Sequence, residues 1–213
     1  QGFGSGARVR TSGELNAARL FLGDDIQKPI TIFDVGANRG EYTSAILALY
    51  PSSRVFSFEP SRETFRLLEV EFAAMSQVFK LNYGLGVKSQ SQLLYKEGQY
   101  ARIASLTPLD VIDPDYTEKV IIRTLDEVVS EYSISEIDLV KIDVEGHELD
   151  VIKGAQNTLS LRKIKFLQFE LGGASIQTNT TLKDIYDVLS KYDYRLYLIS
   201  RRGIVPLDTY DYQ

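Results

Sequence analysis

The chain has 213 residues, of which 44% are hydrophobic and 25% charged, as is ordinary for one soluble globular domain. It has no cysteine and a single histidine, His147, which excludes disulfides, thiolate chemistry and sites that need several imidazole ligands. A formal charge of −5 argues against nucleic acid as a partner, because nucleic-acid binding needs a basic surface. No apolar run approaches the ~20 residues of a membrane span, and no signal peptide is recognisable, so we predict a cytoplasmic protein.

Strand-like and helix-like segments alternate along the chain. Residues 1–29 are predicted to be a lead-in that carries a packing or lid helix, and residues 30–213 to be one globular domain. Runs rich in β-branched and aromatic residues predict strands at 30–35, 54–58, 77–81, 137–142 and 164–169. Apolar residues at helical spacing predict helices after Gly40 and around 65–72, 125–132, 148–159 and 182–191.

The middle of the chain is less regular, and its end has a different pattern. Between residues 84 and 120 only short strands are predicted, at 93–95 and 103–106. A closing hairpin is predicted from 194–199 and 204–207, joined by residues 201–203. The alternation indicates an α/β fold with a doubly wound, mostly parallel sheet, helices on both faces and an antiparallel C-terminal strand. Ligands of such sheets bind beyond the carboxyl ends of the strands.

The loop after the first predicted strand has the character of a cofactor site. Asp34 is followed by a G-x-x-x-G turn formed by Gly36 and Gly40. Asn38 stands where the G-x-G-x-x-G of dinucleotide-binding proteins has its middle glycine. The acidic surroundings suit a ligand with an ammonium and a sulfonium better than a diphosphate, and Asp34 is placed to receive the ammonium directly or through water. The alternative is a structural turn with a capping acid.

Two further strand ends extend this interpretation to a nucleoside. Glu59 follows the second strand about twenty residues after the glycines, where a carboxylate accepts both ribose hydroxyls in nucleotide-binding units. Asn82 ends the third strand, where its amide could contact an adenine edge or serve a turn. The combination favours a nucleoside ligand.

The fourth and fifth predicted strands end in ionisable residues. Asp143, Glu145, His147 and Glu148 fall within six positions, and Glu170 follows the neighbouring strand. Such groups position polar substrates and take protons, and converging like charges are hard to explain by stability alone. The structural alternative is acids at a helix start beside a solvated histidine.

The sequence resembles the FkbM family of S-adenosylmethionine-dependent methyltransferases. The resemblance covers residues 30 to 172 and rests on the segments 33–40, 58–60, 123–126, 139–148 and 152–155. It implies a seven-stranded, Rossmann-like class I methyltransferase sheet and O-methyl transfer to sugars, glycolipids or natural products. It implies cofactor contacts for the methionine moiety, the ribose and the adenine at Asp34, Gly36, Asn38, Gly40, Glu59 and Asn82. It also implies that the acceptor is bordered by Asp143, Glu145, Glu148 and Glu170.

The chemistry of methyl transfer leaves two routes open. Either Asp143 or His147 takes the acceptor's proton while Glu145 and Glu170 orient neighbouring hydroxyls, or carboxylates bind a divalent cation that acidifies the hydroxyl. A sugar or glycan acceptor is favoured over a lipid or a natural-product scaffold, and fusion to other glycan-modifying domains is an expectation.

Acceptor contacts are expected from the lead-in before residue 30 and from residues 95–119, which include Tyr95, Tyr100, Arg102 and Tyr116. The alternatives are a nicotinamide-dependent oxidoreductase, disfavoured by the glycine pattern, and a non-catalytic nucleotide-binding or scaffolding domain.

Overall fold

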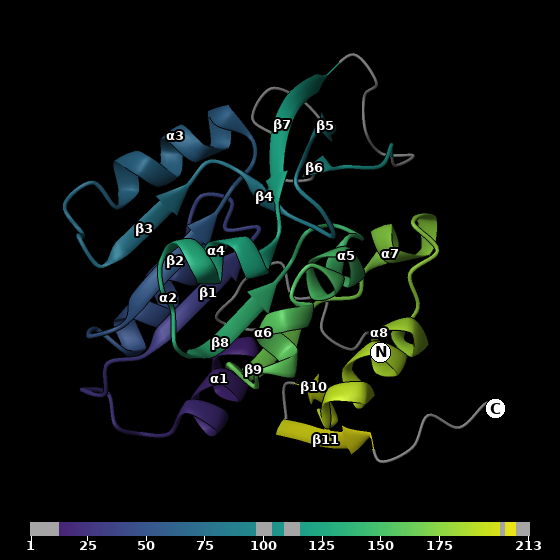
Figure 1. Ribbon diagram of the computed structural model, residues 1–213. Coiled ribbons are helices and arrows are strands. Elements are labelled where there is room, and N and C mark those ends of the chain that lie inside the picture. The colour runs from purple at the N-terminus through teal and green to yellow at the C-terminus, as the bar shows by residue number, and fades with distance from the viewer. Residues whose placement is uncertain (1–12, 97–103, 109–115, 201–202, 208–213) are drawn as a thin grey trace.

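A five-stranded parallel sheet forms the centre of the molecule. The computed structural model describes residues 13–96, 104–108, 116–200 and 203–207 (Figure 1). The strand order is β3-β2-β1-β8-β9. The strands are β1 (Thr31–Val35), β2 (Arg54–Phe58), β3 (Val78–Leu81), β8 (Ile137–Ile142) and β9 (Ile164–Phe169). The strand order reverses between β1 and β8. The carboxyl ends of β1, β2 and β8 therefore lie together at the point where such sheets bind ligands.

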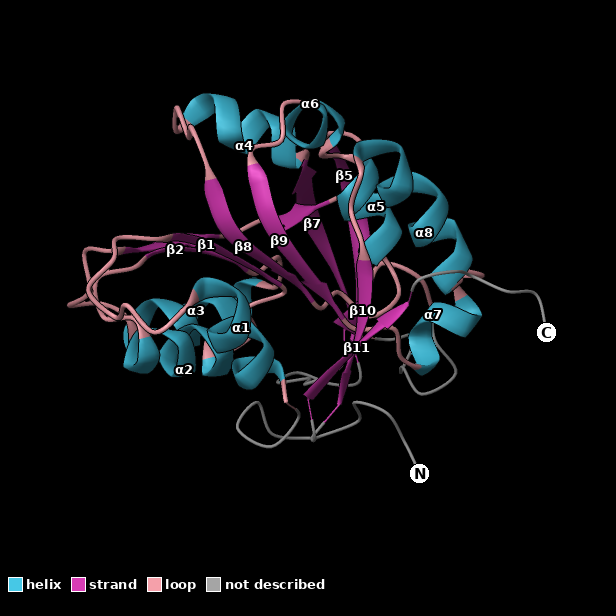
Figure 2. Cartoon of the chain, turned by 90° about the horizontal axis from the view of Figure 1, so that it is seen from below, coloured by secondary structure: helices cyan, strands magenta, loops and turns pink. Residues whose placement is uncertain are grey.

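Helices cover both faces of the sheet (Figure 2). One face is covered by α1 (Glu14–Leu22), α2 (Glu41–Leu49) and α3 (Arg62–Glu71). The other is covered by α4 (Leu125–Glu131), α5 (Glu148–Lys153), α6 (Gln156–Ser160) and α8 (Leu182–Leu189). Buried alternate residues of β1 face opposite cores, with Ile32 toward the first set of helices and Phe33 and Val35 toward the second. The strands therefore read as nearly continuous apolar runs.

A second, smaller sheet stands over the carboxyl ends of the central strands (Figure 1). Its order is β4-β7-β5-β6, with bounds β4 (Gly84–Leu85), β5 (Gln90–Lys96), β6 (Ala104–Ser105) and β7 (Thr117–Arg123). The buried ammonium of Lys96 ties this sheet to α3, at 3.0 Å from Glu63 Oε2 and 3.4 Å from Glu118 Oε2. Sequence reasoning missed the long β7, because polar residues at 117–119 hide the alternation that buries Val120 and Ile122.

The doubly wound, mostly parallel sheet with an antiparallel pair near its C-terminus is confirmed, but the strand count differs. The central sheet has five strands where seven were expected. The reason is that β10 (Leu196–Ser200) and β11 (Gly203–Leu207) pair with each other in a separate two-stranded sheet. The two arginines of the predicted connection, 201–202, lie outside the described residues.

The helix predicted over 148–159 is broken into α5 and α6. A Cβ on Gly154 would lie 2.1 Å from the carbonyl oxygen of Gly86, so the chain needs glycine where it touches that loop. The helix then restarts because Asp126 accepts hydrogen bonds from the backbone N–H groups of Asn157 and Thr158. A further short helix, α7 (Gly173–Gln177), was not predicted.

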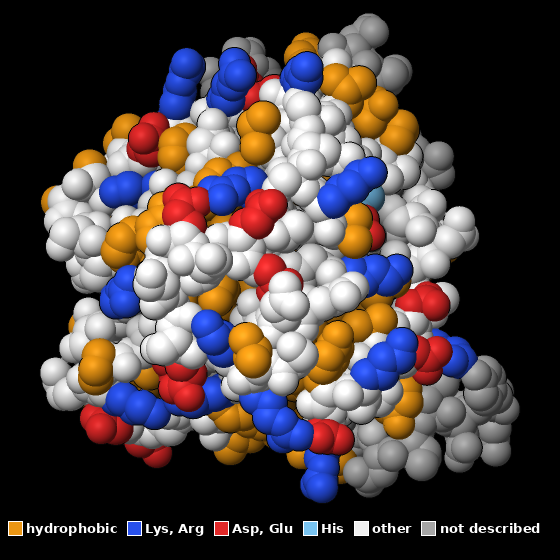
Figure 3. Space-filling view, viewed as in Figure 1, with side chains coloured by type: hydrophobic (Ala, Val, Ile, Leu, Met, Phe, Trp, Pro, Cys, Tyr) orange, Lys and Arg blue, Asp and Glu red, His pale blue; other side chains and the backbone are white. Residues whose placement is uncertain are grey.

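Two surface properties bear on partners. No helix in the described part of the chain is long and apolar enough to cross a membrane. On the face drawn in Figure 3, Lys and Arg side chains are interspersed with Asp and Glu side chains.

Candidate functional site

One cleft collects most of the predicted site residues. It lies between the ends of β1, β2 and β8 and the small sheet, and we call it the strand-end cleft. Its polar lining comes from Asn38, Glu59, Thr64, Asp143, Glu145 and His147. Its apolar wall includes Leu94 and Ile122 of the small sheet. The parallel topology thus brings residues from positions 35 to 147 to a single place.

The glycines of the loop after β1 have different structural reasons. Gly36 lines the cleft at φ 81°, and a Cβ there would lie 1.8 Å from the Asp143 carbonyl oxygen. Gly40, at φ 84°, precedes α2, and its Cβ would meet the ring of Phe72 at 2.3 Å. Gly36 therefore allows two strand-end loops to touch, whereas Gly40 allows α2 to pack against α3. Only Gly36 of the pair borders the cleft.

Asp34 lies beneath the cleft in a buried ionic cluster. Its Oδ2 accepts a hydrogen bond from Thr43 Oγ1 at 2.7 Å. Its Oδ1 has no hydrogen-bond partner, since the buried Lys141 ammonium is 3.7 Å away and bonds Asp143 Oδ2 at 3.1 Å instead. Burial raises the pKa of Asp34, and Lys141 opposes that rise. The orphan oxygen is an acceptor that an ammonium or a water molecule would satisfy.

Glu59 is held rigidly with acceptor capacity to spare. Its Oε2 accepts from the backbone N–H of Asn38 at 3.0 Å, and its Oε1 accepts from that of Ser61 at 2.8 Å. Burial raises its pKa to about 7, and these two bonds oppose that rise. Each carboxylate oxygen keeps one further lone pair, so the group can accept two hydroxyls at once.

Asn82 supports this turn from behind. Its Nδ2 donates to the carbonyl oxygens of Glu59 and Pro60, at 2.9 and 3.2 Å. The amide nitrogen is therefore committed to backbone, and Asn82 does not line the strand-end cleft. Its proximity to an adenine stays a prediction.

The loop after β8 is shaped by Glu148, whose side chain is 1% exposed. Glu148 Oε1 accepts from the backbone N–H groups of Val144 and Gly146, at 3.3 and 3.1 Å. The resemblance placed Glu148 at the acceptor. In the structure Glu148 does not line the cleft but fixes the backbone of the loop. The loop residues that line the cleft with polar side chains are Asp143, Glu145 and His147. Glu145 sits at φ 52°, and burial raises its pKa, with Asp143 adding to the rise.

Glu170 is exposed at the end of β9, outside the cleft lining. Its pKa is raised to about 7 by partial desolvation and by the negative charges of Asp143 and Glu14. The acids of neighbouring strand ends therefore do converge electrostatically. A place for Glu170 in the acceptor site stays a prediction.

Sequence reasoning missed three participants. Lys141 balances the buried Asp34, and the signal for it was a lysine within an otherwise apolar strand. Asp150 contacts His147, and the signal was a carboxylate three residues after the histidine at a helix start. Thr107, from the segment after β6, lies against the same imidazole, and no sequence pattern links two residues so far apart.

Other predictions concern residues that would bind a metal ion or contact the acceptor. Among the described residues, no three His, Asp or Glu side chains are grouped closely enough to hold a metal ion. Of the expected acceptor contacts, Tyr95 lies in β5 of the small sheet, and Tyr116 immediately precedes β7. Tyr100 and Arg102 lie outside the described residues.

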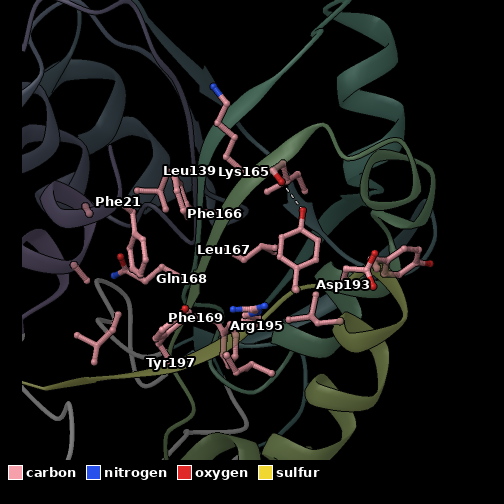
Figure 4. Close-up of a pocket in the computed structure, with 18 of the residues that line it drawn as sticks. Phe21, Leu139, Lys165, Phe166, Leu167, Gln168, Phe169, Asp193, Arg195 and Tyr197 are labelled. Carbon is pink, nitrogen blue, oxygen red and sulfur yellow. Dashed lines mark hydrogen bonds between the residues drawn. The ribbon is translucent and has the colours of Figure 1, made fainter. Parts of the chain in front are cut away.

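A larger cavity, of about 360 Å³, lies along the outer edge of β9 (Figure 4). It is enclosed by α1, β9 and β10, and Phe21, Phe166 and Tyr197 contribute aromatic rings to it. None of the individually predicted catalytic or cofactor residues lines it, although Ala17, Ala18 and Phe21 of the lead-in expected to contact the acceptor do. We assign the chemistry to the smaller strand-end cleft, because that is where the polar groups with perturbed pKa values converge.

Comparison with known proteins accounts for this arrangement. Residues 34–196 match the family model described as the methyltransferase FkbM domain. The chain belongs to the FkbM methyltransferase family. It is 32% identical over 180 residues to the hexuronic acid methyltransferase AglP of Haloferax volcanii, covering 84% of this chain and 69% of AglP. It is 27% identical over 183 residues to the 2-O-methyltransferase NoeI of Sinorhizobium fredii, covering 79% of this chain and 74% of NoeI.

Solved structures agree on the fold. The methyltransferase domain of METTL16 superposes with a TM-score of 0.52 at 13% identity, over 92% of this chain and 64% of that one. The protein is a Rossmann-like, S-adenosylmethionine-dependent methyltransferase. The residues present fit that cofactor, since Asp34 offers an unsatisfied acceptor and Glu59 offers two spare acceptor positions beside a glycine loop.

Proposed function

We propose that this FkbM-family protein transfers a methyl group to a hydroxyl of a sugar or glycan. The observation that carries the proposal is the strand-end cleft. There a diol-accepting carboxylate, Glu59, and a proton-accepting group, His147 or Asp143, face the same space. When bound, S-adenosylmethionine supplies an electrophilic methyl group on a sulfonium, so the protein's task is mainly alignment and proton removal.

We assign the cofactor contacts to the loops after β1 and β2. Gly36 and Asn38 would border the methionine moiety, with Asp34 reached by the ammonium directly or through water. Glu59 would accept both ribose hydroxyls. Gly40 and Asn82 would act through packing and through the Glu59 turn, because neither lines the cleft.

We assign the acceptor side to the loop after β8. Asp143 Oδ2 is already bonded to the Lys141 ammonium at 3.1 Å, so we favour His147 as the base. Glu145 and Glu170 would orient neighbouring hydroxyls. The acidic surroundings favour a hydroxyl over an ionised carboxylate as the methyl acceptor, because a carboxylate would be repelled.

The sugar acceptor is supported by the names of two relatives, the hexuronic acid methyltransferase AglP and the 2-O-methyltransferase NoeI. A lipid or natural-product hydroxyl is the alternative acceptor, and a non-catalytic nucleotide-binding domain is the alternative function. A divalent cation, a cytoplasmic location and fusion to other glycan-modifying domains stay predictions.

Two experiments test the proposal. Calorimetric titration with S-adenosylmethionine, S-adenosylhomocysteine and NAD should show binding of the first two only; binding of NAD alone would overturn the methyltransferase assignment. A panel of neutral and uronic acid-terminated oligosaccharides, lipids and polyketides is then incubated with the cofactor and analysed by mass spectrometry. A methyl gain on sugars alone supports the proposed acceptor, whereas a gain on lipids or polyketides alone contradicts it. Retained turnover after prolonged chelation would remove the metal route.

A further inference from the structure

The single imidazole of the chain has a different partner on each ring nitrogen. His147 directly precedes α5, with its side chain 11% exposed. Its Nδ1 lies 2.9 Å from Asp150 Oδ2, and its Nε2 lies 3.1 Å from Thr107 Oγ1. The two partners come from different parts of the fold, α5 and the segment after β6.

Hydrogen-bonding chemistry decides which nitrogen carries the proton. An ionised carboxylate can only accept, so a neutral imidazole must present an N–H at Nδ1 to Asp150. The hydrogen bond from His147 lowers the pKa of Asp150, which keeps that carboxyl ionised. Nε2 is then the lone-pair nitrogen, and the Thr107 hydroxyl must be the donor to it.

The hydroxyl of Thr107 occupies the position beside His147 Nε2 that an acceptor hydroxyl would need. The segment is fixed by Ser105, whose Oγ donates to the Glu145 carbonyl oxygen at 2.8 Å, and its neighbour Leu106 lines the strand-end cleft beside His147. Thr107 does not itself line the cleft, but its hydroxyl donates to the Nε2 of a cleft-lining histidine and so makes the contact that a methyl acceptor's hydroxyl would have to make.

We propose that Asp150 is a positioning residue that fixes the tautomer and ring orientation of His147, and that Thr107 holds the place of the acceptor hydroxyl at Nε2. This inference rests on the proposed function. In the reaction the acceptor oxygen would bond to the methyl carbon as the carbon–sulfur bond breaks, and the acceptor proton would pass to Nε2. Asp150 stays ionised beside the resulting imidazolium, which later releases its proton to water.

Because the chain contains one histidine, the tautomer can be measured without assignment variants. The protein is labelled with ¹⁵N-histidine, and long-range proton–nitrogen correlations are recorded at pH about 8.5, where an ordinary imidazole is neutral. The expected spectrum shows a protonated Nδ1 and an unprotonated Nε2. Asp150→Ala should give a mixture of tautomers, whereas Thr107→Val should keep the proton on Nδ1. A wild-type spectrum dominated by Nε2–H, or an unchanged Asp150→Ala spectrum, would overturn the proposal.

The matched control is Asp187→Ala, which removes a carboxylate paired with Lys183 on α8 and should leave the spectrum unchanged. Asp150→Asn, which preserves shape, guards against misfolding of the alanine variant and is checked by circular dichroism. With a neutral disaccharide as acceptor, Asp150→Asn should lower kcat at least about tenfold while KM changes less than about twofold. An unaltered kcat would refute the positioning role.

The two levels of inference fail separately. If wild-type protein does not bind S-adenosylmethionine in calorimetry, or methylates none of the sugars in the panel, the proposed function is at fault and the spectra still decide the tautomer. If the cofactor binds and the disaccharide is methylated, but Asp150→Ala leaves the imidazole unchanged, only the role of Asp150 is rejected.

Discussion

The substitution Glu59→Gln is expected to remove most of the cofactor affinity without unfolding the protein. Glu59 accepts two backbone N–H groups, one on each carboxylate oxygen, and keeps a second lone pair on each for a ribose hydroxyl. Glutamine turns one of those oxygens into an NH₂ donor. That donor would face the N–H of Asn38 or of Ser61, so the side chain could no longer serve both hydroxyls.

The expected magnitude follows from the type of bond lost. A hydrogen bond to a charged acceptor contributes about 1.5–3 kcal/mol, and a neutral one about 1 kcal/mol. Losing two charge-assisted bonds and regaining one weaker contact costs about 3 kcal/mol, which is about a hundredfold in the dissociation constant. Stability should fall far less, because the substitution also removes the cost of burying a carboxylate whose pKa is raised to about 7.

The dissociation constant for S-adenosylhomocysteine is measured by calorimetry, and the free energy of unfolding by denaturant titration, for the wild type and for Glu59→Gln. Glu71→Gln, an exposed glutamate at the end of α3, is the matched control and should bind like the wild type. An affinity of Glu59→Gln within about threefold of the wild type would refute the assignment of this carboxylate to the ribose. A parallel loss of affinity and stability would show that the turn itself had collapsed.

Ionisation of Glu59 should make both the stability of the protein and its affinity for the cofactor depend on pH, with opposite signs. The folded pKa of Glu59, about 7, lies above its ordinary value of 4.5, so the folded state holds the proton more tightly. Its contribution therefore makes the free energy of unfolding fall as pH rises from about 4.5 to 7. Cofactor binding has the opposite slope, because the ionised form accepts the hydroxyls. Affinity should rise by up to about tenfold per pH unit below 7, and Glu59→Gln should flatten that part of the profile.

Two further predictions concern the buried support of the site, and both are measured by urea unfolding. Lys141→Met leaves the wholly buried Asp34 without its nearest cation and should lower the free energy of unfolding by about 3–5 kcal/mol; a loss below about 1 kcal/mol would show that Asp34 is buried as the neutral acid. Gly36→Ala forces a Cβ to within 1.8 Å of the Asp143 carbonyl oxygen and should cost at least about 2 kcal/mol. Gly172→Ala, where a Cβ would meet nothing within 4 Å, should be nearly neutral, and equal effects of the two glycine substitutions would contradict the close-contact explanation.

Local patterns were sufficient for the central elements. β1, β2, β3, β8 and β9 all lie where runs of β-branched and aromatic residues predicted them. The signal is strongest for β1, β2 and β8, which are buried over nearly their whole length and so need apolar side chains on both faces. The parallel topology followed from the alternation with helices. That topology predicts Glu59, Asp143 and His147 at one edge of the sheet, since the carboxyl ends of parallel strands share that edge, and all three line the cleft there.

The tertiary structure decided what each of those residues touches. That Gly40 makes room for the Phe72 ring, that Glu148 braces a loop, and that Asp34 is buried against Lys141 depend on neighbours distant in sequence. Hydrophobic periodicity reports only whether a side chain is buried. The partner of a buried charge is fixed by packing in three dimensions, because desolvation makes an unpaired charge too costly to leave. The sequence by itself therefore determined the family, the sheet and the edge that carries the chemistry. Only the folded chain brought Asp150 and Thr107 to the two nitrogens of its single imidazole.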